Sequence, residues 1–402
     1  MKIEIKYKFA MKVVLSTIGK FHTFDLAREL VKRKVLYEIH TGYPGFKLKN
    51  EDVPQSLIHT YPYFHTPYMG FPFWEVIGDR VKQQWEYWDK ISFDRHVAKT
   101  IADCDVFMGL SGSALETARV VKARGGVYIC DRGSSHIRMQ DKILREEHER
   151  WGIPYCPIDP RIIDREEEEY NLADAITVPS SFVHDTFLKY GISREKLNTV
   201  PYGVNTEKFQ KTASPDPTGF NILFVGAVSL RKGIPDLLEA FARLEHPQKT
   251  LTLAGSYSPK LIDWLKCKGL WSPNLIVSGH VPQENLKDLM SRSHVMVLPS
   301  VEEGLAMVQA QAMACGCPVV ATSNTGAQNL FTDGVEGFIV PIRKPEAIAA
   351  SLQLLADQPE RREKMSQAAL ARVRRVGGWS SYGDKVVGLM TDLCRQSIFN
   401  LV

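Results

Sequence analysis

The chain has 402 residues, of which 44% are hydrophobic and 24% are charged. This length allows roughly two or three domains with buried cores, and the composition excludes disordered and fibrous proteins. Lys and Arg (50) exceed Asp and Glu (46) only slightly, which argues against a dedicated nucleic-acid-binding protein.

No run approaches the ~18 consecutive apolar residues of a membrane-spanning helix. Residues 1–9 alternate charged and apolar side chains and do not resemble a secretory signal, and either Met1 or Met11 can be the start of the protein. The seven scattered cysteines favour reduced thiols in a cytoplasmic enzyme over a disulfide framework. Cys315 and Cys317 form a C-x-C pair without a second Cys or His pair nearby, so no zinc site is expected.

The first half of the chain alternates short β-branched runs with stretches of helical spacing. The run at 12–16 is followed by Gly19 and then by helical spacing at 24–34. The same order recurs at 105–110 with 113–123, at 127–130, and at 175–178 with 181–190. Such alternation predicts a parallel sheet covered by helices on both faces.

A second α/β unit follows residues 210–219, which are rich in Pro, Thr and Ser and are expected to form a linker. Expected strands lie at 221–225, 250–254, 275–277, 295–298 and 318–321, and expected helices at 234–244 and 284–291. We therefore predict an α/β protein of two doubly wound domains, which bind ligands beyond the carboxyl ends of their strands.

The stretch 299–320 (PSVEEGLAMVQAQAMACGCPVV) contains a loop followed by an expected helix at 305–314. Unpaired backbone N–H groups at the start of such a helix, near Gly304, Leu305 and Ala306, favour a diphosphate.

In the same stretch, the carboxylate of Glu303 can accept hydrogen bonds from the hydroxyls of a ligand. Gln311 lies about two turns further along the helix, near the same face. On spacing alone, a helix cap with a solvated Glu303 and a structural Gln311 is an equal alternative.

The segment 226–233 (GAVSLRKG) follows an expected strand and precedes the expected helix at 234–244. Gly226 permits close backbone approach, while Arg231 and Lys232 place two cations beside the helix start, which suits a phosphate-bearing leaving group. A solvated surface loop is the alternative, but two such loops on one sheet favour binding.

These two segments resemble the signature of the family 4 glycosyltransferases, which joins a Lys-Gly phosphate loop to PS-x-x-E-G-x-x-x-x-x-x-E-A-M-A-x-G-x-P-V-V. The match is dense over 221–341 and looser over 175–209. The resemblance implies a GT-B fold, in which two Rossmann-like doubly wound domains face a cleft. An acceptor-binding domain is then expected at 1–209 and a nucleotide-sugar-binding domain at 210–379, with the C-terminal helix 380–402 packing back on the first domain.

The resemblance also implies roles for individual residues. Glu303 matches the glutamate that contacts the donor sugar, and Lys232 with Arg231 matches the cations of the phosphate loop. The turn at 279–281 matches the segment that meets the nucleotide base, and Gly19 matches the glycine loop near the diphosphate. The expected donor-binding residues are Gly19, Gly226, Gly279, Val281, Gly304, Leu305, Ala306 and Gln311.

Three positions depart from the family pattern. Gln311 replaces the second glutamate, which usually holds the ribose hydroxyls, and a neutral amide binds them less tightly. Ala227 replaces a frequent arginine, and Asn329 replaces a glutamate that follows the turn near Gly326. A non-catalytic nucleotide-sugar-binding protein is therefore an alternative.

The segment 130–136 (CDRGSSH) follows an expected strand, where the family commonly places a histidine that faces the donor sugar. His136 is the expected catalytic histidine, and a structural loop histidine is the alternative. Asp131 and Arg132 are further candidates for this role or for acceptor contacts.

Residues 43–93 hold 13 of the 39 aromatic residues, among them Trp74 and Trp85. Such enrichment outside a strand pattern is typical of a sugar-stacking or lipid-facing acceptor surface. An aromatic subcore beneath a long loop is the alternative.

We predict a retaining, hexosyltransferase-like enzyme that moves a sugar from a UDP- or GDP-sugar to a hydroxyl of a glycan or lipid-linked glycan in polysaccharide biosynthesis. Catalysis is assigned to Glu303, His136, Arg231 and Lys232, which would stabilise the transferred sugar and the departing diphosphate. Since no D-x-D motif stands in a matching position, no metal and no other cofactor are expected.

We expect a cytoplasmic protein with peripheral association at the cytosolic membrane face. The rival enzymes are a GT-B nucleotide-sugar epimerase and a glycogen-type phosphorylase, for which the chain is short.

Overall fold

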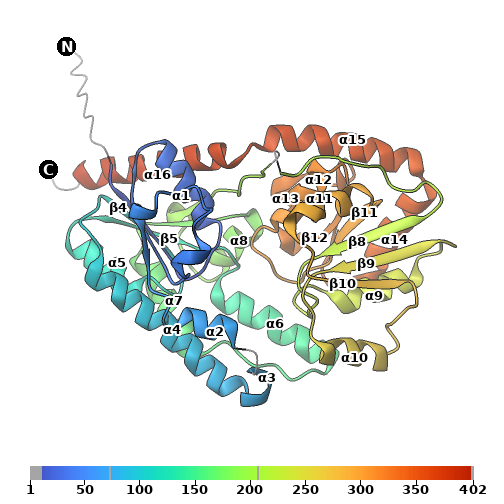
Figure 1. Cartoon of the computed structure of the whole chain (residues 1–402), viewed down its shortest axis with the longest axis horizontal. Helices are drawn as coiled ribbons and strands as arrows, with labels where there is room; N and C mark the ends of the chain where they lie inside the picture. The colour runs from blue at the N-terminus through green and yellow to red at the C-terminus, as the bar shows by residue number, and fades with distance from the viewer. Residues whose placement is uncertain (1–10, 72–73, 206–207, 400–402) are drawn as a thin grey trace, which may run out of the picture.

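The computed structural model describes residues 11–71, 74–205 and 208–399. Figure 1 shows two α/β halves side by side, with the last two long helices running along one edge of both. Some of the predictions fall outside the described residues. They concern residues 1–9 with Met1, residues 72–73 of the aromatic segment and residues 400–402 of the expected C-terminal helix.

The N-terminal half is built on a seven-stranded sheet in the order β3-β2-β1-β4-β5-β6-β7, and every strand pair in it is parallel. The strands are β1 (Val13–Thr17), β2 (Leu36–Thr41), β3 (Ile58–Thr60), β4 (Val106–Leu110), β5 (Val127–Asp131), β6 (Ala175–Val178) and β7 (Leu197–Thr199). Strands β1, β5 and β6 are buried along their whole length, as expected for a sheet covered on both faces.

Helices cover both faces of this sheet (Figure 1). They are α1 (Thr23–Lys32), α2 (His65–Gly70), α3 (Trp74–Ile77), α4 (Asp79–Thr100), α5 (Leu115–Ala123), α6 (Ile137–Trp151), α7 (Pro160–Leu172) and α8 (Ser181–Lys189). In α1, Phe24, Ala27 and Leu30 recur at spacings of three and form a buried stripe. This spacing explains why the segment folds as a helix against the sheet.

The C-terminal half repeats the plan with a six-stranded parallel sheet in the order β10-β9-β8-β11-β12-β13. Its strands are β8 (Phe220–Val225), β9 (Lys249–Ala254), β10 (Leu275–Gly279), β11 (Val295–Leu298), β12 (Val319–Thr322) and β13 (Gly337–Val340). The surrounding helices are α9 (Ile234–Arg243), α10 (Pro259–Cys267), α11 (Gln283–Ser291), α12 (Met307–Ala314), α13 (Ala327–Leu330) and α14 (Pro345–Asp357).

Two final helices, α15 (Pro359–Val376) and α16 (Trp379–Phe399), connect the halves. Helix α15 packs on α12 and α14, whereas α16 packs on α1 and β5 of the N-terminal half (Figure 1). Arg33 at the end of α1 holds α16 through an ion pair with Asp384 at 2.6 Å and a hydrogen bond to the carbonyl of Ser380 at 2.8 Å. The chain therefore returns to the half in which it began.

Candidate functional site

The loops that follow β8 and β11 stand at the switch point of the C-terminal sheet. Strands β8 and β11 are neighbours, while the sheet continues from them in opposite directions through β9 and β12. In open parallel sheets, ligands bind in the crevice at such a point. Both segments singled out in the sequence, 226–233 and 299–306, are these loops.

The phosphate-loop candidate Lys232 lies beside Glu303. The Lys232 Nζ atom forms an ion pair with Glu303 Oε1, and the two side chains are largely buried. Gly233 makes this approach possible, because it adopts a left-handed φ of 66° and a Cβ there would lie 2.1 Å from the carbonyl oxygen of Pro299. The ideal Cβ position of Gly226 lies 3.8 Å from Lys232 Cε, which places this glycine at the same lysine.

The start of α12 differs from the expected helix at 305–314, because α12 begins at Met307. The backbone N–H of Ala306 already donates to the carbonyl of Thr325 at 3.2 Å, so one of the three expected donors is in use. Among the described residues, the N–H groups of Gly304, Leu305, Met307 and Val308 have no acceptor. They form a cluster of free donors at the positive end of a helix, next to Glu303.

Arg231 is engaged by the neighbouring carboxylate Glu302. Its Nη2 atom lies 2.8 Å from Glu302 Oε2 and its Nε donates to the Glu302 carbonyl at 3.2 Å. Nη2 also lies 3.5 Å from the hydroxyl of Ser134 in the N-terminal half. The Nη1 atom has no partner in the described part of the chain, so Arg231 keeps one free donor group.

Glu302 is fully buried and joins the two halves. Its carboxylate accepts hydrogen bonds from the backbone and the hydroxyl of Ser135, at 3.0 and 2.7 Å, and from the amide of Gln140 at 3.3 Å. Burial by itself would raise the pKa of Glu302, but Arg231 and the hydrogen bonds from Ser135 lower this pKa below its ordinary value. Glu302 is therefore a buried, charged contact one residue before the sugar-contact candidate Glu303.

The candidates for nucleoside contacts lie on the loops after β10 and on α12. Gly279 has a left-handed φ of 66°, and its carbonyl accepts the N–H of Gly255 at 2.8 Å. Val281 is half-buried against the C-terminal core. Gln311 is half-buried, and its side-chain amide has no hydrogen-bond partner among the described residues, unlike the buried Gln309, which donates to Thr325 at 2.9 Å.

The other two departures from the family pattern have different surroundings. Ala227 is exposed in the phosphate loop. The Asn329 side-chain oxygen accepts hydrogen bonds from the N–H and hydroxyl of Ser181, at 2.9 and 3.0 Å. Asn329 is thus a contact between the halves.

On the N-terminal side, the loop after β1 carries Gly19 and, three residues later, His22. The Gly19 carbonyl accepts a hydrogen bond from the hydroxyl of Thr17 at 3.2 Å. His22 Nε2 lies 2.6 Å from Asp131 Oδ2, and Asp131 is held in turn by the hydroxyl of Thr177 at 2.9 Å. In the neutral tautomer that donates its Nε2–H to this carboxylate, Nδ1 is an acceptor, and Nδ1 has no partner in the described residues.

His136 lies elsewhere than expected. It caps α6, where its Nδ1 accepts the N–H of Arg138 at 3.3 Å, and its ring stacks on Tyr190 with centroids 4.5 Å apart. The side chain is 1% exposed, and burial lowers its pKa to about 4. The ring of His136 is therefore enclosed by aromatic side chains, which argues against the expected contact with the donor sugar.

Arg132 is also enclosed, contrary to the expected acceptor contact. Its guanidinium pairs with Glu166 at 2.6 Å and donates to the Ser135 carbonyl at 3.1 Å and to Gln140 at 2.9 Å. These bonds fix the loop that carries Ser135, the partner of Glu302. Arg132 is thus a support of the interface between the halves.

The aromatic segment contains β3, α2, α3 and most of α4, and these helices lie at the outer edge of the N-terminal half (Figure 1). Trp74 packs edge-on against Trp85 with centroids 6.1 Å apart, and each indole N–H donates to a nearby backbone carbonyl. Trp85 and Trp88 are nevertheless 38% and 49% exposed. The segment is a subcore on its inner side and an apolar surface on its outer side.

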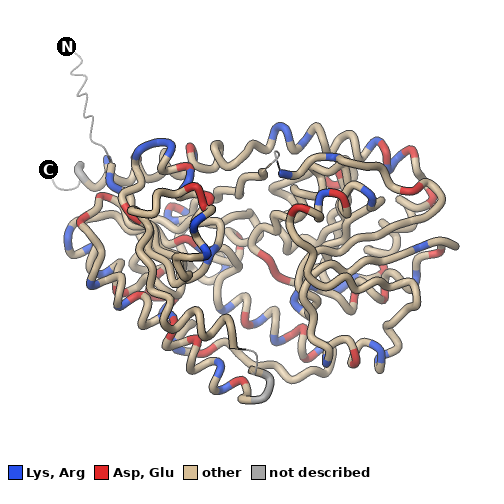
Figure 2. The backbone as a smooth tube through the Cα atoms, viewed as in Figure 1, with Lys and Arg blue, Asp and Glu red and all other residues tan. Residues whose placement is uncertain are grey.

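Charges of both signs are interspersed over the two halves (Figure 2). Within residues 11–71, 74–205 and 208–399, no three His, Cys, Asp or Glu side chains are grouped so that they could hold a metal ion. In the same ranges, no helix combines the length and the apolar character that crossing a membrane requires.

Comparison with known families gives one domain match, in which residues 205–372 fit the family described as glycosyl transferases group 1. Residues 205–372 are therefore similar to the group 1 glycosyltransferases. A D-inositol 3-phosphate glycosyltransferase of Xylanimonas cellulosilytica is 28% identical over 251 residues, which are 58% of this chain and 59% of that protein. A glycogen synthase of Mycobacterium tuberculosis is 26% identical over 218 residues, or 52% of each chain. The matches thus span little more than half the length of these relatives.

Solved structures confirm the GT-B fold of this chain. Sucrose-phosphate synthase of Thermosynechococcus elongatus aligns with a TM-score of 0.70 at 18% identity, over 95% of this chain and 99% of its own. HepE of Anabaena, in complex with UDP and glucose, aligns with a TM-score of 0.70 at 15% identity, over 95% and 100% of the two chains. The prediction of two Rossmann-like domains is therefore correct.

Sequence reasoning missed two residues beside the candidate site, His22 and Glu302. His22 follows the glycine loop of the first strand, which was a usable signal, but its partner Asp131 is 109 residues away. Glu302 stands beside Glu303, and only the fold shows that its carboxylate contacts both Arg231 of the phosphate loop and Ser135 of the N-terminal half.

Proposed function

We propose that this chain transfers a sugar from a nucleoside diphosphate sugar to an acceptor hydroxyl, with retention of the anomeric configuration. The observation that carries the proposal is the contact between Lys232 and Glu303 beside four free N–H groups at the start of α12. Such a site offers a cation and helix-end donors to a diphosphate and a carboxylate to sugar hydroxyls at one point. We take residues 210–379 as the donor half and 1–209 as the acceptor half.

The names of similar proteins support a nucleotide-sugar donor. HepE of Anabaena has been solved with UDP and with UDP-glucose, and the relatives include glycogen synthases and D-inositol 3-phosphate glycosyltransferases. We propose a UDP- or GDP-sugar as donor and a glycan or lipid-linked glycan as acceptor, in polysaccharide biosynthesis.

In this mechanism, charge develops on the β-phosphate as the bond between the sugar and the diphosphate breaks. Lys232, the free Nη1 of Arg231 and the N–H groups at the start of α12 would stabilise that charge. Lys232 can do so without leaving Glu303, because an ammonium group has three donors. These groups supply the positive charge that a metal ion would otherwise provide, so we propose that the reaction needs neither a metal nor another cofactor.

In the N-terminal half, we assign the role that was expected of His136 to His22. Its Nε2 is fixed by Asp131 at 2.6 Å, which leaves Nδ1 to accept a hydrogen bond from a hydroxyl of the donor sugar or the acceptor. The aromatic surface of α2 to α4 would hold the apolar part of a lipid-linked acceptor and bring the protein to the cytosolic face of a membrane.

A donor screen tests this function. UDP-, GDP- and ADP-sugars are incubated with the protein and a mixture of glycan acceptors, and release of nucleoside diphosphate is measured with and without a metal chelator. Release with one sugar and an α-linked product from an α-linked donor is the expected result. A thermal shift with nucleotide but no turnover would indicate a non-catalytic binding protein, and conversion of the sugar without transfer would indicate an epimerase.

A further inference from the structure

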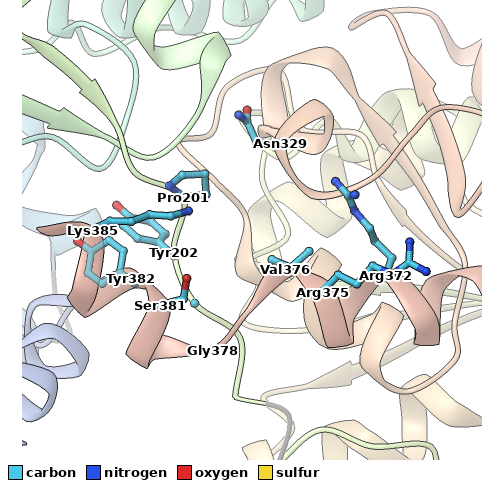
Figure 3. Close-up of a pocket in the computed structure, with 11 residues that line it drawn as sticks. Pro201, Tyr202, Asn329, Arg372, Arg375, Val376, Gly378, Ser381, Tyr382 and Lys385 are labelled. Carbon is cyan, nitrogen blue, oxygen red and sulfur yellow. The ribbon is translucent and has the colours of Figure 1, made fainter. Parts of the chain in front are cut away.

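A cavity of about 140 Å³ lies at the hinge between the halves, away from the phosphate loop. It is bounded by the link after β7, by α13 and by the junction of α15 and α16, as Figure 3 shows. None of Lys232, Glu303 and Gln311 is among the residues that line it. The cavity therefore does not include these three candidates for donor binding.

Three cations line this cavity: Arg372, Arg375 and Lys385. No carboxylate lines it, and in the described residues none of the three cations forms an ion pair with Asp or Glu. Arg372 is held in place because its Nε donates to the carbonyl of Leu330 at 2.9 Å, which leaves both terminal nitrogens of the guanidinium free. The cavity thus concentrates uncompensated positive charge.

Neutral donors at the same cavity are also free. Ser381 lies in the first turn of α16, a helix of 21 residues, and lines the cavity with its hydroxyl unbonded within the described ranges. The backbone N–H groups of Trp379 and Ser381 also have no acceptor within the described ranges, and they lie at the positive end of α16. Asn329 uses its side-chain oxygen for Ser181, so its amide nitrogen remains a donor.

We propose that the hinge cavity binds a phosphate group, either of a small phosphorylated molecule or as the free ion. A phosphate has several acceptor oxygens and up to two negative charges, which match three cations and the donors around them. The cavity volume of about 140 Å³ exceeds the ~30 Å³ that one water occupies in the liquid, so the cavity has room for a substituent on the phosphate.

Such a ligand would connect the two halves. Asn329, Arg372 and Arg375 belong to the C-terminal half, whereas Ser381 and Lys385 lie on α16, which packs on α1 and β5 of the N-terminal half. A phosphate that contacts both sets stabilises this arrangement of the halves. The site is independent of the proposed transfer reaction, and its test does not require turnover.

The test is calorimetric titration of the full chain with orthophosphate and, separately, with glucose 6-phosphate. The variant Arg375→Gln with Lys385→Gln removes two exposed cations of the cavity and should weaken phosphate binding at least about tenfold. The matched control is Arg374→Gln with Lys364→Gln, which changes two exposed cations of α15 that do not line the cavity. This control and Lys232→Ala should retain the affinity within about twofold. Circular dichroism checks that each variant is folded.

Two results would overturn the proposal. One is an affinity of the cavity variant equal to that of the wild type, and the other is loss of phosphate binding in Lys232→Ala but not in the cavity variant. Tighter binding of glucose 6-phosphate than of orthophosphate would identify a phosphorylated small molecule as the occupant. The reverse order would identify the free ion.

Discussion

Glu302 of the C-terminal half accepts the backbone N–H of Ser135 in the N-terminal half at 3.0 Å, and the hydroxyl of the same serine at 2.7 Å. This contact stands one residue before Glu303, so the position of the sugar-contact candidate depends on the loop after β5. A change in the relative position of the halves would therefore move the carboxylate that is expected to meet the donor.

Replacing Glu302 with Gln should lower the free energy of unfolding by about 1–3 kcal/mol, because Arg231 loses its carboxylate partner. Since the pKa of Glu302 lies below its ordinary value of 4.5, its charge stabilises the fold above about pH 4.5 and this contribution is lost on acidification. Urea unfolding at pH 7 and pH 3 measures the difference, which should shrink at pH 3. Glu284→Gln, at an exposed position, is the control, and an equal effect of both variants would contradict the role of Glu302.

Replacing Lys232 with Ala should weaken the binding of nucleoside diphosphate by about 1–3 kcal/mol, because a charge-assisted bond to phosphate is lost. Glu303→Gln should instead reduce turnover more than nucleotide affinity, since Glu303 is assigned to the sugar. Calorimetry with the nucleotide and initial rates with the donor separate these effects. Unchanged affinity of Lys232→Ala would refute the phosphate role.

Replacing Gln311 with Glu should tighten nucleotide binding about tenfold. The amide of Gln311 has no protein partner in the described chain, and a carboxylate there would accept charge-assisted bonds from two ribose hydroxyls. Titration with the nucleoside diphosphate and with its 2′-deoxy form measures the gain, which only the ribonucleotide should show. Gln328→Glu, at an exposed residue of α13, is the control.

The sequence predicted the central strands closely and missed several polar helices. Strands β6 and β11 have the predicted bounds, because strands buried on both faces need continuous apolar runs. Helix α6, which was not predicted, is mostly charged, and its charges are paired with distant parts of the chain. Arg150 pairs with Asp236 at 2.6 Å and Glu147 with Arg343 at 2.7 Å, and no local pattern signals such partners.

The candidate site was predictable where both contacting residues follow strands of the same sheet. Lys232 and Glu303 follow neighbouring strands, so the strand order brings them together. The choice of histidine depended on contacts between loops far apart in the chain. His136 is closer to the end of β5, but it turns into the aromatic side chains of α7 and α8, while His22 reaches Asp131 from β1.

Replacing His136 with Asn should flatten the acid dependence of stability. The pKa of the buried His136 is about 4, against 6.5 in the unfolded chain, so the unfolded state binds more protons between these values. The contribution of neutral His136 to the free energy of unfolding is therefore complete above about pH 6.5. This contribution falls by at most about 3 kcal/mol as the pH drops to 4. Urea unfolding across this range measures the slope, and His280→Asn, at an exposed histidine, should leave it unchanged. An unaltered slope in His136→Asn would show that other groups set the acid dependence.

The outer aromatic surface of α2 to α4 should bind vesicles that contain anionic lipid. Phe64, Arg80, Val81, Trp85 and Trp88 line a cavity of about 390 Å³ there, which joins apolar rings to a cation. Indole rings are favoured at the interface between lipid headgroups and acyl chains, and a charged contact with the headgroups is screened over ~8 Å at physiological salt.

The variant Trp85→Ala with Trp88→Ala should therefore lose at least about tenfold in vesicle affinity, measured by co-sedimentation at low and high salt. The control is Ile276→Ala with Val335→Ala, which removes apolar side chains of similar exposure from the C-terminal half. Transfer to a lipid-linked acceptor should fall in the tryptophan variant, while transfer to a short water-soluble acceptor should persist. If this variant keeps both vesicle binding and full transfer, the tryptophans serve only the packing of α2 to α4, in which Trp85 contacts Trp74 and donates to the carbonyl of Phe64.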